Sequence, residues 1–193
     1  MDLLIDLHAP GASVIIDVCC NAKRIWRGSA HASTVRGYDI NEEVKPDRVC
    51  SWDALPDADA SVDVVVFDPP HLPRHSSTAP GYENLFGIQK GELPSWRPPL
   101  IEAKRVLRPQ GCVLVKVQDF VNADRYVRRS HYVCRVAERV GFRVEDIIVK
   151  VRRPGANSSR WKKARRSRAA HCYWIVLQKP GRRKSKEPAW LAI

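Results

Sequence analysis

The sequence predicts an α/β fold, a single Rossmann-like doubly wound sheet that is mostly parallel with an antiparallel last strand. Short apolar runs alternate along the chain with stretches of helical periodicity, as in parallel sheets joined by crossover helices. The last two apolar runs, Val144–Val151 and Cys172–Gln178, follow one another without a predicted helix between them, which indicates a hairpin. A length of 193 residues fits one domain.

The first third of the chain contains four of the predicted strands. Ser13–Val18 is the first clear apolar run, and a helix is predicted after it over about Lys23–Ser33. Short strands are predicted at Val35–Asp39 and Arg48–Ser51. Val62–Phe67 is the strongest strand, because a parallel strand covered on both faces is expected to be nearly all apolar.

The rest of the chain begins with a long predicted loop over residues 71–94, rich in Pro, Gly, Ser and His. Loops of this length inside a compact domain are usually functional or disordered. A helix is predicted over about Trp96–Leu107, because its apolar residues recur on one face. A stop signal follows it, and then a strand over Cys112–Val117 and a helix over about Arg125–Val140.

The basic charge is large and unevenly distributed. A formal net charge of +12 implies a polyanionic partner, with nucleic acid as the first candidate and an anionic membrane surface as the second. We divide the chain into a domain over 1–179, with a basic hairpin insertion at 152–170, and a basic tail over 180–193 that we expect to be mobile.

The insertion contains no acidic residue and places one tryptophan among its cations. This composition suits phosphate contact combined with base stacking, although a solvated charged loop is the alternative. Because the insertion lacks a long apolar face, it argues against a membrane partner. The candidate nucleic-acid-binding residues are Arg152, Arg153, Arg160, Trp161, Lys162, Lys163, Arg165, Arg166 and Arg168.

The six cysteines form no CxxC pair and no Cys/His cluster with zinc-ligand spacing, so we expect no metal. Most lie inside apolar runs, which favours free thiols in a reducing compartment. The N-terminal segment lacks the pattern of a signal peptide, and no apolar run reaches membrane-spanning length. We expect a soluble cytoplasmic protein that is a monomer or a homodimer.

Aspartates recur where the predicted strands end. Asp17 and Asp39 end the first two strands, Asp53 lies just past the third, and Asp68 ends the fourth. A single aspartate after a strand is commonly a turn residue or helix cap. Four in register predict a site, because ligands of open parallel sheets bind beyond the carboxyl ends of the strands.

These segments resemble the class I S-adenosylmethionine-dependent methyltransferases, and the resemblance covers nearly the whole chain. It implies a seven-stranded sheet and S-adenosylmethionine as the cofactor. Asp17–Lys23 is similar to the turn that cradles the methionine part, Asp39 to the acid that accepts from the ribose hydroxyls, and Asp53 to the acid at the adenine amino group. The implied cofactor-binding residues are Asp17, Val18, Cys19, Asn21, Lys23, Asp39, Ile40, Asp53, Ala54 and Asp68.

The first of these segments departs from the family pattern. Asn21 and Ala22 stand where glycines usually allow a positive φ or a close approach to the ligand. Asparagine is the residue other than glycine that best adopts the left-handed conformation, so we predict that the turn still forms around Asn21.

Asp68-Pro69-Pro70-His71 is similar to the Asp-Pro-Pro-aromatic signature of amino-group methyltransferases. An exocyclic amine is a poor nucleophile, because its lone pair is delocalised into the base. The Asp68 carboxylate and the Pro69 carbonyl can accept its two hydrogens and favour a localised lone pair. His71 replaces the usual aromatic residue and could stack on the base, whereas the alternative is a proline-rich turn. The implied catalytic residues are Asp68, Pro69, Pro70 and His71.

The segments Asp17–Cys19, Asp68–Leu72, Trp161–Lys163 and His171–Trp174 together resemble small phage- and bacterial-type DNA methylases. The resemblance implies methylation of an exocyclic amino group, adenine N6 or cytosine N4, in DNA. Aspartate as the first signature residue favours adenine. Two alternatives stay open: an RNA amino-group methyltransferase, and a nucleic-acid-binding protein on a degenerate methyltransferase scaffold.

Overall fold

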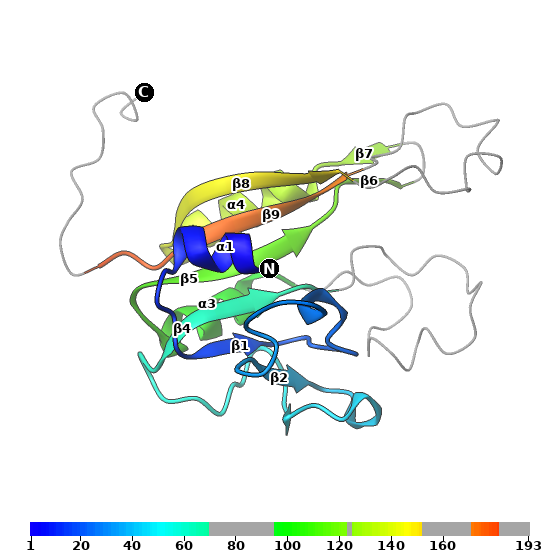
Figure 1. Ribbon diagram of the computed structural model, residues 1–193. Coiled ribbons are helices and arrows are strands. Elements are labelled where there is room, and N and C mark those ends of the chain that lie inside the picture. Colours follow the sequence, from blue (N-terminus) through cyan, green and yellow to red (C-terminus); the bar gives the residue numbers. More distant parts are fainter. Residues whose placement is uncertain (70–94, 123–124, 152–170, 182–193) are drawn as a thin grey trace.

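A seven-stranded sheet organises the chain in a computed structural model that describes residues 1–69, 95–122, 125–151 and 171–181 (Figure 1). The predicted loop over 71–94, the insertion over 152–170 and most of the tail lie outside these residues. The strand order is β3-β2-β1-β4-β5-β9-β8. The strands are β1 (Ile15–Asp17), β2 (Arg36–Asp39), β3 (Arg48–Val49), β4 (Val62–Phe67), β5 (Leu107–Val117), β8 (Arg143–Val151) and β9 (His171–Gln178).

The direction of the strands confirms the predicted fold class. The five strands from β3 to β5 run parallel, and β9 lies between β5 and β8 and pairs antiparallel with both. Leu114 of β5 pairs with Val176, and Ile147 of β8 pairs with Ile175. The chain therefore forms a mostly parallel sheet with an antiparallel last strand.

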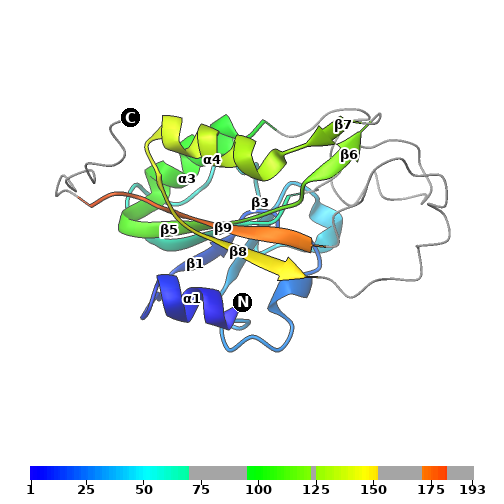
Figure 2. The same ribbon diagram turned by 90° about the horizontal axis from the view of Figure 1, so that it is seen from above.

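Helices cover both faces of the sheet, as Figure 2 shows. On one face lie α3 (Arg97–Val106) and α4 (Arg129–Val140), and on the other lies the short helix α1 (Asp2–His8). The central strand β4 contributes Val65 and Phe67 to the core under α3 and Val64 and Val66 to the core under α1. Burial on both faces explains why this strand is apolar almost throughout.

The predicted helix over Lys23–Ser33 is wrong. The structure has only one 3-10 turn there, η1 (Arg24–Trp26), followed by further turns. Lys23 and Gly28 adopt positive φ values of 50° and 75°, which an α-helix does not accommodate. Trp26 is buried, and its indole N–H donates to the Asp17 carboxylate at 2.7 Å, so a specific side-chain contact replaces regular helix packing.

The predicted helix over Arg125–Val140 is wrong at its start. Residues Phe120–Asn122 (β6) and Arg125–Val127 (β7) form a small antiparallel pair, and α4 begins only at Arg129. The buried Asp119 carboxylate accepts hydrogen bonds from the amide and hydroxyl of Ser130, which satisfies the first turn of α4. Helix α4 therefore begins later in the sequence than the apolar pattern indicates.

Three smaller features complete the fold. Strand β5 begins at Leu107 rather than at the predicted Cys112, with a register shift against β4 between these two residues. Helix α1 and the 3-10 turn η2 (Glu42–Val44) were not predicted. Among the residues that the structure describes, no helix is long and apolar enough to cross a membrane.

Candidate functional site

Three of the four strand-end aspartates come together beyond β1, β2 and β4. Asp17 and Asp39 are buried, and Asp68 is partly buried. Burial raises the pKa of Asp17 to about 7. The negative charges of Asp68 and Asp39, which lie close enough to interact with Asp17, contribute to this rise after burial.

The chain between β1 and η1 forms the predicted turn. Asn21 has a φ of 43°, which confirms the left-handed conformation expected there, and Lys23 has a φ of 50°. One oxygen of the Asp39 carboxylate accepts from the backbone N–H of Asn21 at 2.9 Å, and the other accepts from the backbone N–H of Asn41 at 3.0 Å. Asp39 therefore ties the end of β2 to the turn after β1.

Close packing against β2 fixes the same turn. A Cβ atom on Gly37 would lie 2.9 Å from both Cβ and Sγ of the buried Cys20, and the Cys20 amide donates to the Tyr38 carbonyl at 3.0 Å. Asp47 accepts from the Lys23 ammonium at 2.7 Å and from the Gly37 amide at 2.6 Å. The glycine that this turn requires thus lies on the neighbouring strand.

Asp17 has a structural role besides its place in the site. Its carboxylate accepts from the Trp26 indole at 2.7 Å and from the Cys19 amide at 3.3 Å. Val18 beside it is buried in the core. The hydrogen bonds to Asp17 lower its pKa, but the larger effect of burial outweighs them. Asp17 is therefore a carboxyl group that ionises near neutral pH in the folded chain.

The fourth aspartate, Asp53, lies in an exposed loop. Asp53 and Ala54 are exposed after β3, and the Asp53 carboxylate accepts from the Ser51 hydroxyl. The loop is anchored to α3, because Leu55 donates its amide to Glu102 at 2.8 Å and its carbonyl accepts from Arg105 at 3.0 Å. The side chain of Ile40, after β2, is 48% exposed.

Asp68 follows β4 directly. Its amide donates to Cys19 Sγ at 3.1 Å, and its carboxylate Oδ2 lies 2.7 Å from the Lys116 Nζ of β5. The side chains of Asp68 and Lys116 are only 15% and 19% exposed. Pro69 is buried, whereas the predicted catalytic residues Pro70 and His71 lie outside the described residues.

Lys116 is a candidate residue that the sequence reasoning missed. It stands in an otherwise apolar run, with Leu114, Val115 and Val117 all fully buried. Phe67 pairs with Val115, so the next residues along these parallel strands, Asp68 and Lys116, lie side by side. A lone cation in a buried strand is the signal that could have found it.

A basic and aromatic surface continues from the end of β5. Arg125 and Arg128 are exposed on either side of Tyr126, whose side chain is 47% exposed. At the start of β9, His171 Nε2 lies 2.8 Å from the hydroxyl oxygen of Tyr173. The nine predicted nucleic-acid-binding residues of the insertion lie outside the described residues.

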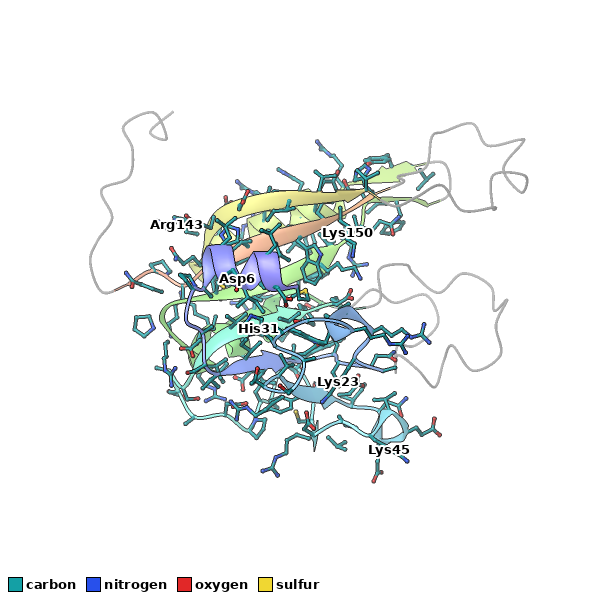
Figure 3. The ribbon with its side chains drawn as sticks, viewed as in Figure 1. Asp6, Lys23, His31, Lys45, Arg143 and Lys150 are labelled. Atoms are coloured by element: carbon teal, nitrogen blue, oxygen red, sulfur yellow. The ribbon has the colours of Figure 1, made fainter. Side chains whose placement is uncertain are left out.

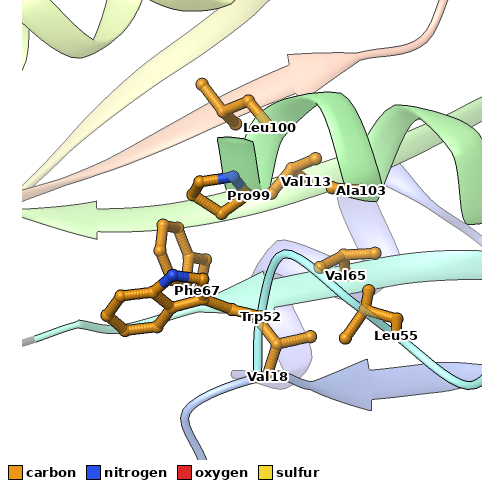
Figure 4. Close-up of a pocket in the computed structure, with 9 residues that line it drawn as sticks. All are labelled: Val18, Trp52, Leu55, Val65, Phe67, Pro99, Leu100, Ala103 and Val113. Carbon is orange, nitrogen blue, oxygen red and sulfur yellow. The ribbon is translucent and has the colours of Figure 1, made fainter. Parts of the chain in front are cut away.

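The apolar crevice in Figure 4 lies between β4, β5, α3 and the loop after β3, with Val18 at the end of β1. Trp52 and Trp96 each pack edge to face on Phe67, with ring centroids 5.3 Å and 5.1 Å away. The crevice does not admit a water molecule, so we assign it to the core. In the part of the chain that the structure describes, no group of three His, Cys, Asp or Glu side chains could hold a metal ion.

No protein-family model matches the sequence, and no curated protein matches it. Solved structures share its fold. The [4+2]-cyclase SpnF superposes with a TM-score of 0.59 at 15% identity, covering 93% of this chain and 82% of its own. A methyltransferase from Methanosarcina mazei, described as dependent on S-adenosylmethionine, has a TM-score of 0.57 at 14% identity, covering 92% and 97%.

A 16S rRNA (adenine(1408)-N(1))-methyltransferase from Catenulisporales acidiphilia gives a TM-score of 0.55 at 10% identity, covering 90% of this chain and 88% of its own. These likenesses establish the architecture: the chain has the Rossmann-like fold of class I methyltransferases, with seven strands and an antiparallel strand inserted before the edge. One of these structures is a cyclase, so the reaction has to be argued from the site.

Proposed function

We propose that the protein is an S-adenosylmethionine-dependent methyltransferase that modifies an exocyclic amino group of a nucleobase, with adenine N6 in DNA as the favoured acceptor. The observation that carries the proposal is the position of Asp68. Its carboxylate follows the central strand and lies beside Asp17, at the edge of the sheet where ligands of this fold bind.

The residues at this edge fit the cofactor. The left-handed turn at Asn21 lies against Asp39, and each Asp39 oxygen accepts one backbone N–H. A carboxylate oxygen can accept a second hydrogen bond, so Asp39 can still hold the ribose hydroxyls. When bound, S-adenosylmethionine supplies an electrophilic methyl group on a sulfonium centre. The buried negative charge of Asp17 and Asp39 suits such a cation.

Asp68 and Pro69 act on the acceptor in this proposal. An ionised carboxylate is a hydrogen-bond acceptor only, and the backbone carbonyl of proline is one too. Together they can take both hydrogens of an exocyclic amine, which fixes the nitrogen and favours a localised lone pair. The predicted role of Pro70 is to stiffen the chain, and that of His71 is to pack on the base.

A nucleic-acid substrate is supported by charge and by the surface near Asp68. The chain has a formal net charge of +12, and the insertion over 152–170 contains basic residues and no acidic one. Arg125, Tyr126 and Arg128 are exposed beside the end of β5, where they could contact phosphates and stack on a base. We therefore predict DNA as the partner. RNA is the alternative, and comparing DNA with RNA as methyl acceptors distinguishes the two.

The test is methyl transfer from radiolabelled cofactor to double-stranded DNA, single-stranded DNA and RNA. We expect transfer to DNA by the wild type, a fall of at least about 100-fold in the Asp68→Ala variant, and N6-methyladenine in the digested product. Asp6→Ala is the matched control, because Asp6 lies on α1 away from the site (Figure 3). Equal inactivity of the wild type and Asp68→Ala on every acceptor would contradict the proposal, whereas preference for RNA would reassign the substrate.

A further inference from the structure

Lys116 is placed where an unpaired lysine would be costly. Its neighbours in β5 are fully buried, and its own side chain is 19% exposed. An ammonium group withdrawn from water is tolerated only when an opposite charge or hydrogen bonds compensate it. The compensation here is the Asp68 carboxylate, 2.7 Å from Nζ.

A second contact holds the lysine side chain. Lys116 pairs with Trp174 of β9, and its Nζ lies 5.9 Å from the centre of the indole ring. A cation above an indole face is attracted to it, and the ring also packs against the aliphatic stem. Trp174 is itself buried, so the lysine is fixed between a carboxylate just after one neighbouring strand, β4, and an aromatic ring on the other, β9.

We propose that Lys116 is a positioning residue for methyl transfer: by binding one oxygen of Asp68 it fixes the orientation of that carboxylate and keeps it in the acceptor-only, ionised form. The inference rests on the proposed function, because it gives Asp68 the task of accepting hydrogens from the amine. A protonated carboxyl group would donate a hydrogen instead and would oppose that task.

The surrounding charges explain why a cation is needed at this place. Asp17 and Asp39 lie close by and share no ion pair with a lysine or arginine in the described part of the chain. Like charges gathered at one edge disfavour ionisation of each carboxyl group. The ammonium of Lys116 offsets this repulsion directly at Asp68, and a charge-assisted hydrogen bond is also stronger and more directional than a neutral one.

The kinetic test compares Lys116→Met and Lys116→Arg with the wild type at saturating cofactor and DNA. We expect Lys116→Met to lower kcat about 10- to 100-fold, since small errors of position are costly in catalysis. We expect Lys116→Arg to recover part of this loss, because a guanidinium also pairs with a carboxylate. The Kd for S-adenosylmethionine, measured by calorimetry, should change less than about twofold, because Lys116 acts on the acceptor side.

Lys150→Met is the matched control for the loss of one positive charge. Lys150 is exposed near one end of β8, at the opposite end from Arg143 (Figure 3). It should leave kcat unchanged. An unchanged kcat in Lys116→Met overturns the inference. So does a weakened Kd for the cofactor with kcat retained, which would make Lys116 a cofactor ligand instead.

The pair can also be tested without turnover. Lys116→Met should lower Tm, because it leaves the Asp68 charge partly buried without this partner, and the double variant Asp68→Asn/Lys116→Met should recover part of the loss. No recovery overturns the pairing. If the wild type transfers methyl to no acceptor, the proposed function falls and this role of Lys116 falls with it. If the wild type is active and Lys116→Met equals it, only the inference falls.

Discussion

The two halves of the site use the same kind of side chain in opposite ways. At the ends of β1 and β2, the carboxylates of Asp17 and Asp39 are buried and accept hydrogen bonds from backbone amides and from an indole N–H. Next to β4 and β5, the Asp68 carboxylate pairs with the charged side chain of Lys116. In the first half, the carboxylates therefore stabilise the shape of a turn. In the second half, the carboxylate lies at the edge of the sheet and a cation compensates its charge.

This difference predicts where substitutions act. Changes in the β1–β2 half should appear mainly in stability, because its carboxylates are part of the packing. Changes at Asp68 and Lys116 should appear mainly in kcat.

The largest effect is expected from Asp17→Asn. The folded-state pKa of Asp17 is raised from 3.8 to about 7, so the native state binds this proton more tightly than the unfolded chain does. The contribution of Asp17 to stability is therefore fully present below pH 4 and is lost as the pH rises to about 7. One pKa unit corresponds to about 1.4 kcal/mol, which sets an upper limit of roughly 4 kcal/mol for the loss.

Asp17→Asn should abolish most of that pH dependence, and the carboxamide oxygen can still accept from the Trp26 indole. Urea unfolding at pH 4 and at pH 8 measures it. The free energy of unfolding of the wild type should fall between these two values, and that of the variant should stay nearly level. Asp53→Asn, which changes an exposed carboxylate, is the control. A variant that keeps the wild-type slope would show that Asp17 is not the titrating group.

The next effect is expected from Gly37→Ala. The new methyl group would lie 2.5 Å from Cε of Lys23, a flexible side chain that can move, and 2.9 Å from Cβ and Sγ of Cys20. Cys20 is buried and its backbone is hydrogen-bonded to Tyr38, so it has little room to move. Overpacking of this kind typically costs about 1–3 kcal/mol. Urea unfolding gives the loss, and the double variant Gly37→Ala/Cys20→Ala, which removes the sulfur, should lose less than the sum of the two single variants. Simple additivity would mean that the contact with the Cys20 sulfur does not cause the loss.

How much of the molecule the sequence predicts depends on how each feature is encoded. The strand-end positions of Asp17 and Asp68 follow from the apolar runs before them, because strands buried on both faces are largely apolar. Asn21 follows from the backbone preference of one residue type, and its φ of 43° confirms that prediction. Such features are local in the sequence.

Features that depend on contacts between distant residues were not predicted. The partnership of Asp68 and Lys116 requires the register of β4 against β5, which no periodicity reveals. The absence of a helix after Lys23 depends on the hydrogen bond from Trp26 to Asp17 and on two left-handed residues. The late start of α4 depends on Asp119, whose partner Ser130 lies beyond the intervening hairpin.

The smallest effect is expected at Asn21. Because asparagine already tolerates the left-handed conformation, Asn21→Gly should change the free energy of unfolding by less than about 1 kcal/mol. Asn21→Ala should be destabilising by about 1–2 kcal/mol, since alanine gains nothing from its side chain at a φ of 43°. Urea unfolding of the three proteins separates these outcomes.

Calorimetry with S-adenosylmethionine extends the same comparison to the site. If Asn21 serves the turn only through its backbone conformation, Asn21→Gly should bind the cofactor as the wild type does, because glycine reaches the same φ without strain. The backbone N–H at position 21 would still donate to Asp39, which is the contact that joins the turn after β1 to the end of β2. A glycine variant that is stable but binds the cofactor much more weakly would show that the asparagine side chain itself contacts the ligand. The β1–β2 half would then contribute chemistry as well as shape.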